Sequence, residues 1–229
     1  YAYVVDGPRT NIYLCTVNSD GTLSNGCIVQ GSGYDYPEHV TVLGSTLYAA
    51  DQGSPGGGEV TVCNISSTDG TLSGCFVTAS AGGLNYASGV ALGGDFGYVA
   101  TDNNGLFTCA FDSIAGALTN CAVAATSSSV SDAWNVVISG GIAYFANAES
   151  GLTACAIGSG GDLSSCTDSS LGGGTPPMAT GVDVNGGRAY VSTWDMMFGN
   201  ADVELCPISG LTVSACGVAV SDGSDSGFS

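Results

Sequence analysis

Residues 59–78 read EVTVCNISSTDGTLSGCFVT, and this stretch decides the fold. Alternating apolar and polar residues on both sides of an Asp-Gly turn are typical of a β-hairpin. Each arm carries one cysteine, and recognisable versions of the stretch occur five times and use all ten cysteines. The pairs, separated by 12, 12, 12, 11 and 10 positions, are Cys15/Cys27, Cys63/Cys75, Cys109/Cys121, Cys155/Cys166 and Cys206/Cys216.

We predict that each hairpin holds one disulfide. An even number of cysteines in repeated pairs is typical of proteins that fold in an oxidising compartment. Zinc sites need closer cysteine spacing or histidine partners, and His39 is the single histidine. Each bridge closes a loop of about 11 to 13 residues and contributes roughly 3 kcal/mol. The expected location is extracellular, and the sequon at Asn64 agrees with a secreted glycoprotein.

A tyrosine followed three positions later by a polar residue recurs at spacings of 45, 50, 46 and 46 positions, which is the period of a propeller blade. We expect the tyrosines to pack between repeats and the polar residues to cap the following turns, although a ligand-binding ring is the alternative. The motifs are Tyr3-Val-Val-Asp6, Tyr48-Ala-Ala-Asp51, Tyr98-Val-Ala-Thr101, Tyr144-Phe-Ala-Asn147 and Tyr190-Val-Ser-Thr193.

Each repeat is expected to contain four short strands, called A to D in chain order. Strand A is the apolar alternation in residues 39–43, 89–92, 135–138 and 181–184, strand B carries the tyrosine, and strands C and D are the arms of the cysteine hairpin. No stretch shows a 3.6-residue apolar period, so helix should be nearly absent. This pattern predicts an all-β, five-bladed β-propeller of four-stranded antiparallel blades, in one domain over residues 1–229. The repeat units are expected at about 1–36, 37–86, 87–133, 134–179 and 180–229.

The Tyr-Val-x-[Thr/Asn/Asp] strand and the Asp-Gly-Thr-Leu-Ser hairpin resemble the YVTN-type repeats of secreted and surface β-propeller proteins. The resemblance covers essentially the whole chain, and its motif is specific for the fold and weak for activity. Relatives with such repeats include lactonase-like enzymes and surface-layer or adhesive proteins, usually with seven blades. The five repeats of this chain depart from that number.

Strand A of the first repeat is missing, because the sequence begins directly at a strand B pattern, Tyr1-Ala-Tyr3. The chain ends after Cys216 at about the distance where a further strand A would start. The sequence therefore leaves three interpretations: a fragment, an open inner edge in the first blade, or a strand supplied by another chain.

Charge and composition exclude some partners. Twenty carboxylates face two cations, Arg9 and Arg188, and the net charge of −18 repels nucleic acid. Polar residues interrupt every apolar run, so no segment reaches the roughly 18 to 20 apolar residues of a membrane span. No EF-hand-like loop occurs, so we expect neither a metal site nor a cofactor, with at most loose calcium binding at residues 102–104 and 222–225.

The aromatic and apolar residues outside the repeat pattern are the candidate contact residues. Aromatic faces stack on sugar rings, and an exposed apolar cluster marks a contact surface. The candidates are Trp134, Trp194, Met196, Met197 and Phe198.

No catalytic grouping is evident. The sequence has no G-x-S-x-G or H-E-x-x-H motif, and His39 is expected to be structural. Asp183 stands where the other strand A patterns have Thr41, Ala91 and Val137, so it is the best candidate for a carboxylate near the channel. Glycosidases need two such carboxylates, and we find only one.

The sequence thus favours a non-enzymatic, extracellular structural or assembly protein that self-associates or binds another extracellular protein by strand addition at its incomplete first blade. A carbohydrate-binding propeller is the alternative, which would take glycans as ligands. A lactonase-like or glycosidic hydrolase is the third hypothesis.

Overall fold

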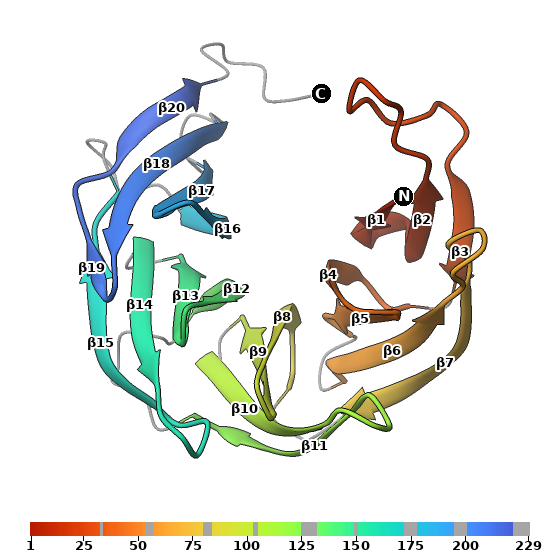
Figure 1. Cartoon of the computed structure of the whole chain (residues 1–229), viewed down its shortest axis with the longest axis horizontal. Coiled ribbons are helices and arrows are strands. Elements are labelled where there is room, and N and C mark those ends of the chain that lie inside the picture. The colour runs from red at the N-terminus through yellow and green to blue at the C-terminus, as the bar shows by residue number, and fades with distance from the viewer. Residues whose placement is uncertain are drawn as a thin grey trace.

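The protein is a five-bladed β-propeller. The structure, a computed structural model, describes residues 1–32, 34–53, 57–79, 84–102, 105–124, 132–148, 151–171, 178–194 and 201–221. These residues form five antiparallel sheets that follow one another around a ring (Figure 1). We call the sheets blades 1 to 5 in chain order. The one helical element in the described residues is a short 3-10 helix, η1 (Gly7–Arg9), so the expected scarcity of helix is confirmed there.

The strands follow the predicted A-to-D order. Blade 1 consists of β1 (Ala2–Asp6), β2 (Asn11–Cys15) and β3 (Ile28–Ser32). Blade 2 consists of β4 (Pro37–Leu43), β5 (Thr46–Asp51), β6 (Glu59–Ile65) and β7 (Leu72–Ala79). Blade 3 consists of β8 (Ala87–Gly93), β9 (Phe96–Thr101), β10 (Gly105–Asp112) and β11 (Ala117–Val123). Blade 4 consists of β12 (Ala133–Ser139), β13 (Ile142–Asn147), β14 (Gly151–Ile157) and β15 (Leu163–Ser169).

Blade 5 differs from the others at its outer edge. It consists of β16 (Met178–Asn185), β17 (Arg188–Trp194), β18 (Ala201–Ser209), β19 (Thr212–Val213) and β20 (Gly217–Ser221). The outer strand position is divided between β19 and β20, and both pair with β18. The predicted four-stranded blade is therefore kept in blades 2 to 4, while blade 1 has three strands, β1 to β3, in the described residues.

The apolar core lies between the blades. Alternate side chains of each strand point to opposite faces, so every blade contributes to two apolar layers. Tyr48 and Ala50 of β5 face blade 3, whereas Leu47 and Ala49 of the same strand face blade 1. Four such clusters of buried residues occur in the described part of the chain, one between each pair of consecutive blades. The stability of the ring therefore depends on contacts between neighbouring repeats.

At one repeated position of the innermost strands, blades 2 and 4 carry a side chain that bonds to the next blade, and blades 3 and 5 carry glycine. This position, occupied by His39, Gly89, Asn135 and Gly181, follows a shift of strand register near the start of β4, β8, β12 and β16. His39 Nδ1 accepts a hydrogen bond from the Val90 backbone N–H at 3.4 Å, and Asn135 Oδ1 accepts one from Val182 at 3.4 Å.

All five predicted disulfides are present, one in each blade: Cys15–Cys27, Cys63–Cys75, Cys109–Cys121, Cys155–Cys166 and Cys206–Cys216. Their Cα atoms are 4.0 to 4.3 Å apart. In blades 2 to 4 the first cysteine of the pair lies at an irregularity of the strand register. The bridges connect the two outer strand positions and lie far from the ring centre (Figure 1).

Candidate functional site

The inner edge of β1 is the first candidate site. In blades 2 to 5 the strand that carries the repeated tyrosine pairs on both sides, as β5 does with β4 and β6. Among the described residues, β1 pairs with β2 alone. Alternate backbone N–H and C=O groups of residues 2–6 therefore face away from the sheet. An unpaired strand edge of this kind is a template for another strand.

The side chains of β1 are divided between its two faces. Tyr3 and Val5 pack against the cluster between blades 1 and 2. Val4 points the other way and has 40% of its surface exposed. It pairs in register with Tyr13, which in turn pairs with Val29, so three strands contribute to one face. Val29 is also exposed. Within the described residues, blade 1 thus has an unpaired inner edge and a partly apolar, exposed face.

Four of the five polar residues that follow the repeated tyrosines form the side-chain to backbone hydrogen bonds expected of turn caps. Asp51 accepts hydrogen bonds from the backbone N–H groups of Asp35 at 2.8 Å and Gly53 at 3.1 Å. The Thr101 hydroxyl donates to the Gly105 carbonyl at 2.7 Å, and the Thr193 hydroxyl donates to the Asp202 carbonyl at 3.4 Å. Asp6 accepts from the Arg9 backbone N–H at 3.3 Å and forms an ion pair with its guanidinium at 3.4 Å.

Acidic side chains gather beside these turns. The pKa of Asp102 is raised to about 6, chiefly by burial and also by the nearby Asp132 and Glu38. Burial is also the main cause that raises the pKa of Asp51. In the part of the chain that the structure describes, no group of three or more His, Cys, Asp or Glu side chains is placed to hold a metal ion. Because both pKa values are raised, the ionised forms of Asp51 and Asp102 each lower the stability of the folded chain at neutral pH.

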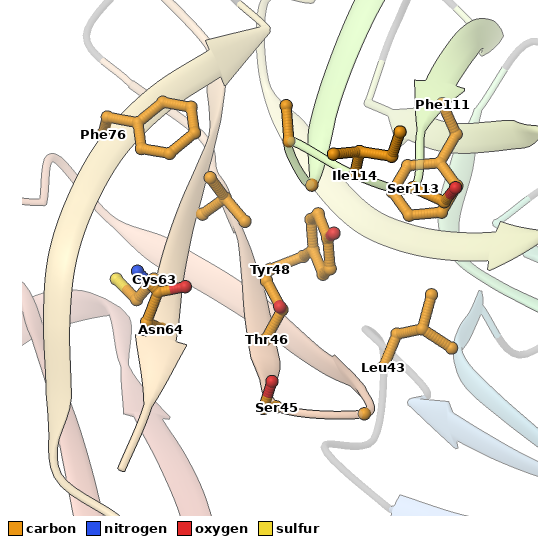
Figure 2. Close-up of a pocket in the computed structure, with 14 residues that line it drawn as sticks. Leu43, Ser45, Thr46, Tyr48, Cys63, Asn64, Phe76, Phe111, Ser113 and Ile114 are labelled. Carbon is orange, nitrogen blue, oxygen red and sulfur yellow. The ribbon is translucent and has the colours of Figure 1, made fainter.

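A hollow between blades 2 and 3 is the second candidate site (Figure 2). Its volume is about 470 Å³. Tyr48 and Phe111, whose ring centroids are 6.2 Å apart in an edge-to-face arrangement, form part of its wall. Phe76 and Ile114 also line it, and Ile114 is 97% exposed. No carboxylate or histidine among the described residues lines the hollow, so these two kinds of general acid or base are absent from its described wall.

The sequon residue Asn64 borders this same hollow (Figure 2). It lies in β6 and is exposed, so its amide is accessible to solvent. Occupancy of the sequon stays a prediction.

The two predicted tryptophans lie in different blades. Trp134 is near the start of β12, and its indole N–H is buried without a hydrogen-bond partner among the described residues. Trp194 ends β17 and is 45% exposed. Met196, Met197 and Phe198 lie outside the described residues. Of the apolar cluster predicted around Trp194, the structure therefore describes Trp194 alone.

Asp183 does not meet a second carboxylate in the described part of the chain. It lies on β16, is exposed, and accepts a hydrogen bond from the Val184 backbone N–H at 2.8 Å. Its direct neighbour in the strand register is Tyr190 of β17. His39 is a structural residue: burial lowers its pKa to about 4, and Nδ1 accepts a backbone hydrogen bond. These placements provide no acid–base pair.

The sequence pattern did not reveal the hollow between blades 2 and 3. Its wall combines residues from β5, β6 and the turn after β10, which are neighbours only in the folded ring. The repeated tyrosines were a partial signal, because Tyr48 is both a core residue and a wall residue. For Tyr190 the expectation of core packing was wrong, because its side chain is 40% exposed.

No helix in the described ranges has the length and apolar character that a membrane crossing requires.

Two segments of the chain match a known repeat model. Residues 85–108 and 131–159 match the LVIVD repeat model. The matched segments contain the inner strands of blades 3 and 4, including the tyrosine signatures at Tyr98 and Tyr144. A search of curated proteins found none that is similar in sequence.

Several solved structures have a similar fold. The luciferin-regenerating enzyme is 13% identical with a TM-score of 0.62, over 90% of this chain and 75% of that one. A putative 6-phosphogluconolactonase from Bacteroides uniformis is 14% identical with a TM-score of 0.62, over 94% and 64%. A chain of a nidogen/laminin complex is 14% identical with a TM-score of 0.59, over 95% and 84%.

The solved structures of similar fold are longer than the part that this chain matches. The chain spans 55% of the length of the computationally designed Ika8 protein, at a TM-score of 0.51, and 71% of a Lactobacillus plantarum protein, at 0.57. At identities of 11 to 17% the likeness shows the fold alone. The solved structures thus show a propeller fold, and two segments of this disulfide-bridged chain, in blades 3 and 4, match the LVIVD repeat model.

Proposed function

We propose that this chain is a non-enzymatic, extracellular assembly protein that binds a strand of a partner protein at the inner edge of β1. The observation that carries the proposal is the pairing of β1 on one side alone in the described residues. Main-chain hydrogen bonds along such an edge supply affinity, and the alternating side-chain positions supply specificity. Five disulfides support an oxidising, extracellular location.

The site chemistry supports binding more than catalysis. Neither the hollow between blades 2 and 3 nor the surroundings of Asp183 contains an acid–base pair in the described residues. One chain of similar fold belongs to a nidogen/laminin complex, so this architecture also occurs in an assembly of proteins.

A strand peptide in trans tests the proposal directly. The probe is a fluorescent peptide with the sequence of residues 178–185, MATGVDVN, which forms the inner strand of blade 5. We expect it to bind the full chain and to protect the amide protons of residues 2–6 from exchange. Two control peptides carry N-methyl groups on alternate amides. Only the set whose N–H groups face β1 should abolish binding, because strand addition uses one edge of the peptide.

Absence of binding at millimolar peptide contradicts strand addition. Equal binding by both N-methylated peptides also contradicts it, because the contact would then depend on side chains alone.

Glycan binding is the second candidate, and the half-exposed Trp194 is the observation that favours it. A glycan array should then show binding that Trp194→Ala abolishes, while Trp134→Ala, at a largely covered indole, leaves it intact. A hydrolase of the lactonase or glycosidase type needs Asp183 as a reacting group. Turnover of a lactone or glycoside that Asp183→Asn abolishes is the result that would support it.

A further inference from the structure

Neighbouring blades are joined by a repeated hydrogen bond from a tyrosine hydroxyl to a turn carbonyl. The Tyr3 hydroxyl donates to the carbonyl of Gly70 in blade 2 at 2.6 Å. Tyr98 donates in the same way to Gly161 of blade 4 at 3.1 Å. Tyr144 donates to Gly210 of blade 5 at 3.0 Å. Each strand that carries the signature tyrosine thus contacts the hairpin turn of the next blade, and we call this contact the tyrosine latch.

Blades 2 and 3 have the same two groups at their interface, a signature tyrosine and a turn glycine. A Cβ atom on Gly116 would lie 3.3 Å from the Tyr48 hydroxyl, so the two groups are adjacent. The turn glycine has a positive φ in every blade, between 59° and 85°, which only glycine adopts without strain. These glycines are Gly21, Gly70, Gly116, Gly161 and Gly210. All five turns therefore present their backbone in a similar conformation.

Among the described residues, no tyrosine donates the latch hydrogen bond to the turn of blade 1. The turn of blade 1 is built like that of blade 2: Asp20 accepts hydrogen bonds from the Thr22 backbone N–H at 3.0 Å and hydroxyl at 2.6 Å. Asp69 makes the equivalent bonds to Thr71 at 3.1 and 2.8 Å. In blade 2 the turn glycine lies against Tyr1 and Leu14, whereas a Cβ on Gly21 would meet nothing within 4 Å.

The latch also has an unused donor in blade 5. Tyr48, Tyr98 and Tyr144 are at most 3% exposed, whereas Tyr190 is 40% exposed. In the part of the chain that the structure describes, its hydroxyl has no hydrogen-bond partner.

Apolar residues around the latch show the same two open faces. The residue after the tyrosine points to the preceding blade, and Ala49, Val99, Phe145 and Val191 are fully buried there. The equivalent Val4 of blade 1 is 40% exposed. On blade 5, the half-exposed Trp194 shares a face with Tyr190, because alternate residues of β17 point to the same side. Figure 1 shows blade 5 and blade 1 facing each other across the opening of the ring.

We propose that the two open faces bind a partner β-sheet of the same repeat. Its hairpin turn accepts a hydrogen bond from the Tyr190 hydroxyl, and its own signature tyrosine donates to the Gly21 carbonyl. Each open face has the same residues as one side of the interface between consecutive blades. A partner that presents the other side of that interface should therefore fit it. The proposal rests on the proposed function of partner binding and adds the chemistry of the partner.

The donor half of the site is tested with a hairpin in trans. The probe is a peptide of residues 59–78 with its Cys63–Cys75 bridge, because the Gly70 turn of this hairpin already accepts the latch bond of Tyr3. Binding to the full chain is followed by NMR. We expect amide shifts on β17 and β18, and a dissociation constant about fivefold larger for Tyr190→Phe, the loss of one hydrogen bond.

The matched control is Tyr144→Phe, which removes a hydroxyl from a latch that is already formed. It should leave the affinity for the hairpin unchanged and lower the equilibrium constant for folding about fivefold. Tyr190→Phe should leave the folding equilibrium of the chain alone unchanged. The reduced, alkylated peptide should bind more weakly than the bridged one.

Two results would overturn the proposal. Absence of amide shifts on β17 and β18 at millimolar hairpin removes the site. If Tyr190→Phe lowers the folding equilibrium as Tyr144→Phe does, the hydroxyl is already bonded. In that case, light scattering identifies the group that binds the hydroxyl. A constant monomer mass indicates that blade 5 closes onto blade 1, and a mass that rises with concentration indicates a second copy of the chain.

The hairpin and the β16 strand peptide separate this proposal from the proposed function. The two probes occupy different surfaces, the face of blade 5 and the edge of β1, so neither should compete with the other. Hairpin binding without strand binding refutes strand addition alone. Strand binding without hairpin binding refutes the latch partner alone.

Discussion

His39 shows how one repeat position accepts different residues for the same purpose. It accepts a hydrogen bond from Val90, as Asn135 accepts one from Val182 at the equivalent place in blade 4. Burial lowers the pKa of His39 to about 4, because the protonated ring is poorly solvated there. The single histidine of the sequence is therefore a neutral acceptor between inner strands.

The stability contributed by neutral His39 should be lost as the pH falls. In the unfolded chain the imidazole takes a proton below about 6.5, whereas in the fold it does so only near 4. The unfolded state thus binds more protons between these values, and the free energy of unfolding falls by up to about 3 kcal/mol across the window. Urea unfolding at a series of pH values measures this loss.

His39→Asn is the matched variant, because asparagine already fills the equivalent position in blade 4. It should keep the acceptor for Val90 and flatten the difference in stability between pH 7 and pH 4. Carboxylates such as Asp102 titrate in the same window, and they do so in both proteins. An unchanged pH profile for His39→Asn would show that His39 does not cause the loss.

At the scale of elements, the cysteine hairpin is the unit that the sequence predicted best. All five bridges and the A-to-D strand order follow from alternation, Asp-Gly turns and spacing, which are local properties. The sequence did not predict that blade 5 would divide its outer strand into β19 and β20, because that depends on pairing with β18. Nor did it predict the exposure of Tyr190, because burial there requires a neighbouring sheet.

The candidate sites divide in the same way. The free edge of β1 was predictable, because it follows from a missing pattern within one repeat. The hollow beside Tyr48 and the tyrosine latch were not predictable, because each is formed by residues of two consecutive blades. In the latch, the two bonded residues are 63 to 67 positions apart in the sequence. Sequence periodicity predicts the strands and turns within each repeat, whereas the contacts between repeats are known only from the folded structure.

Each hairpin disulfide should contribute a similar amount of stability. The bridges close loops with sequence separations of 10 to 12, and loop-closure entropy changes little over that range. We expect Cys109→Ala with Cys121→Ala, in blade 3, to lower the free energy of unfolding by about 3 kcal/mol. The control is the equivalent pair of changes at Cys206 and Cys216 in blade 5, which should cost nearly the same.

Denaturant titration of both variants measures the effect. An unchanged midpoint in either variant would show that its bridge does not constrain the unfolded chain. A loss several times larger in one blade would assign the stabilisation to packing around that bridge instead.

At the scale of the molecule, the ring is a series of blades in which each blade completes the interface of its neighbour. In the described part of the chain, the first and last blades each pack against one neighbouring blade, and their other faces carry Val4 and Tyr190, each 40% exposed. Terminal repeats of solenoid-like proteins usually present a polar outer face. Here both end faces keep the residue types of the interior, which is the general reason to expect a partner.

The charge of the whole molecule should make its stability depend on salt. Twenty carboxylates and two cations give a net charge of −18, and folding brings these carboxylates closer together. Raising the ionic strength from about 0.01 to about 0.3 M with NaCl shortens the screening length several-fold and should stabilise the fold by about 1 kcal/mol. CaCl2 at the same ionic strength is the control, and screening alone predicts an equal gain in the free energy of unfolding. A larger, saturable gain with calcium would contradict simple screening and indicate a cation site that the repeat pattern does not reveal.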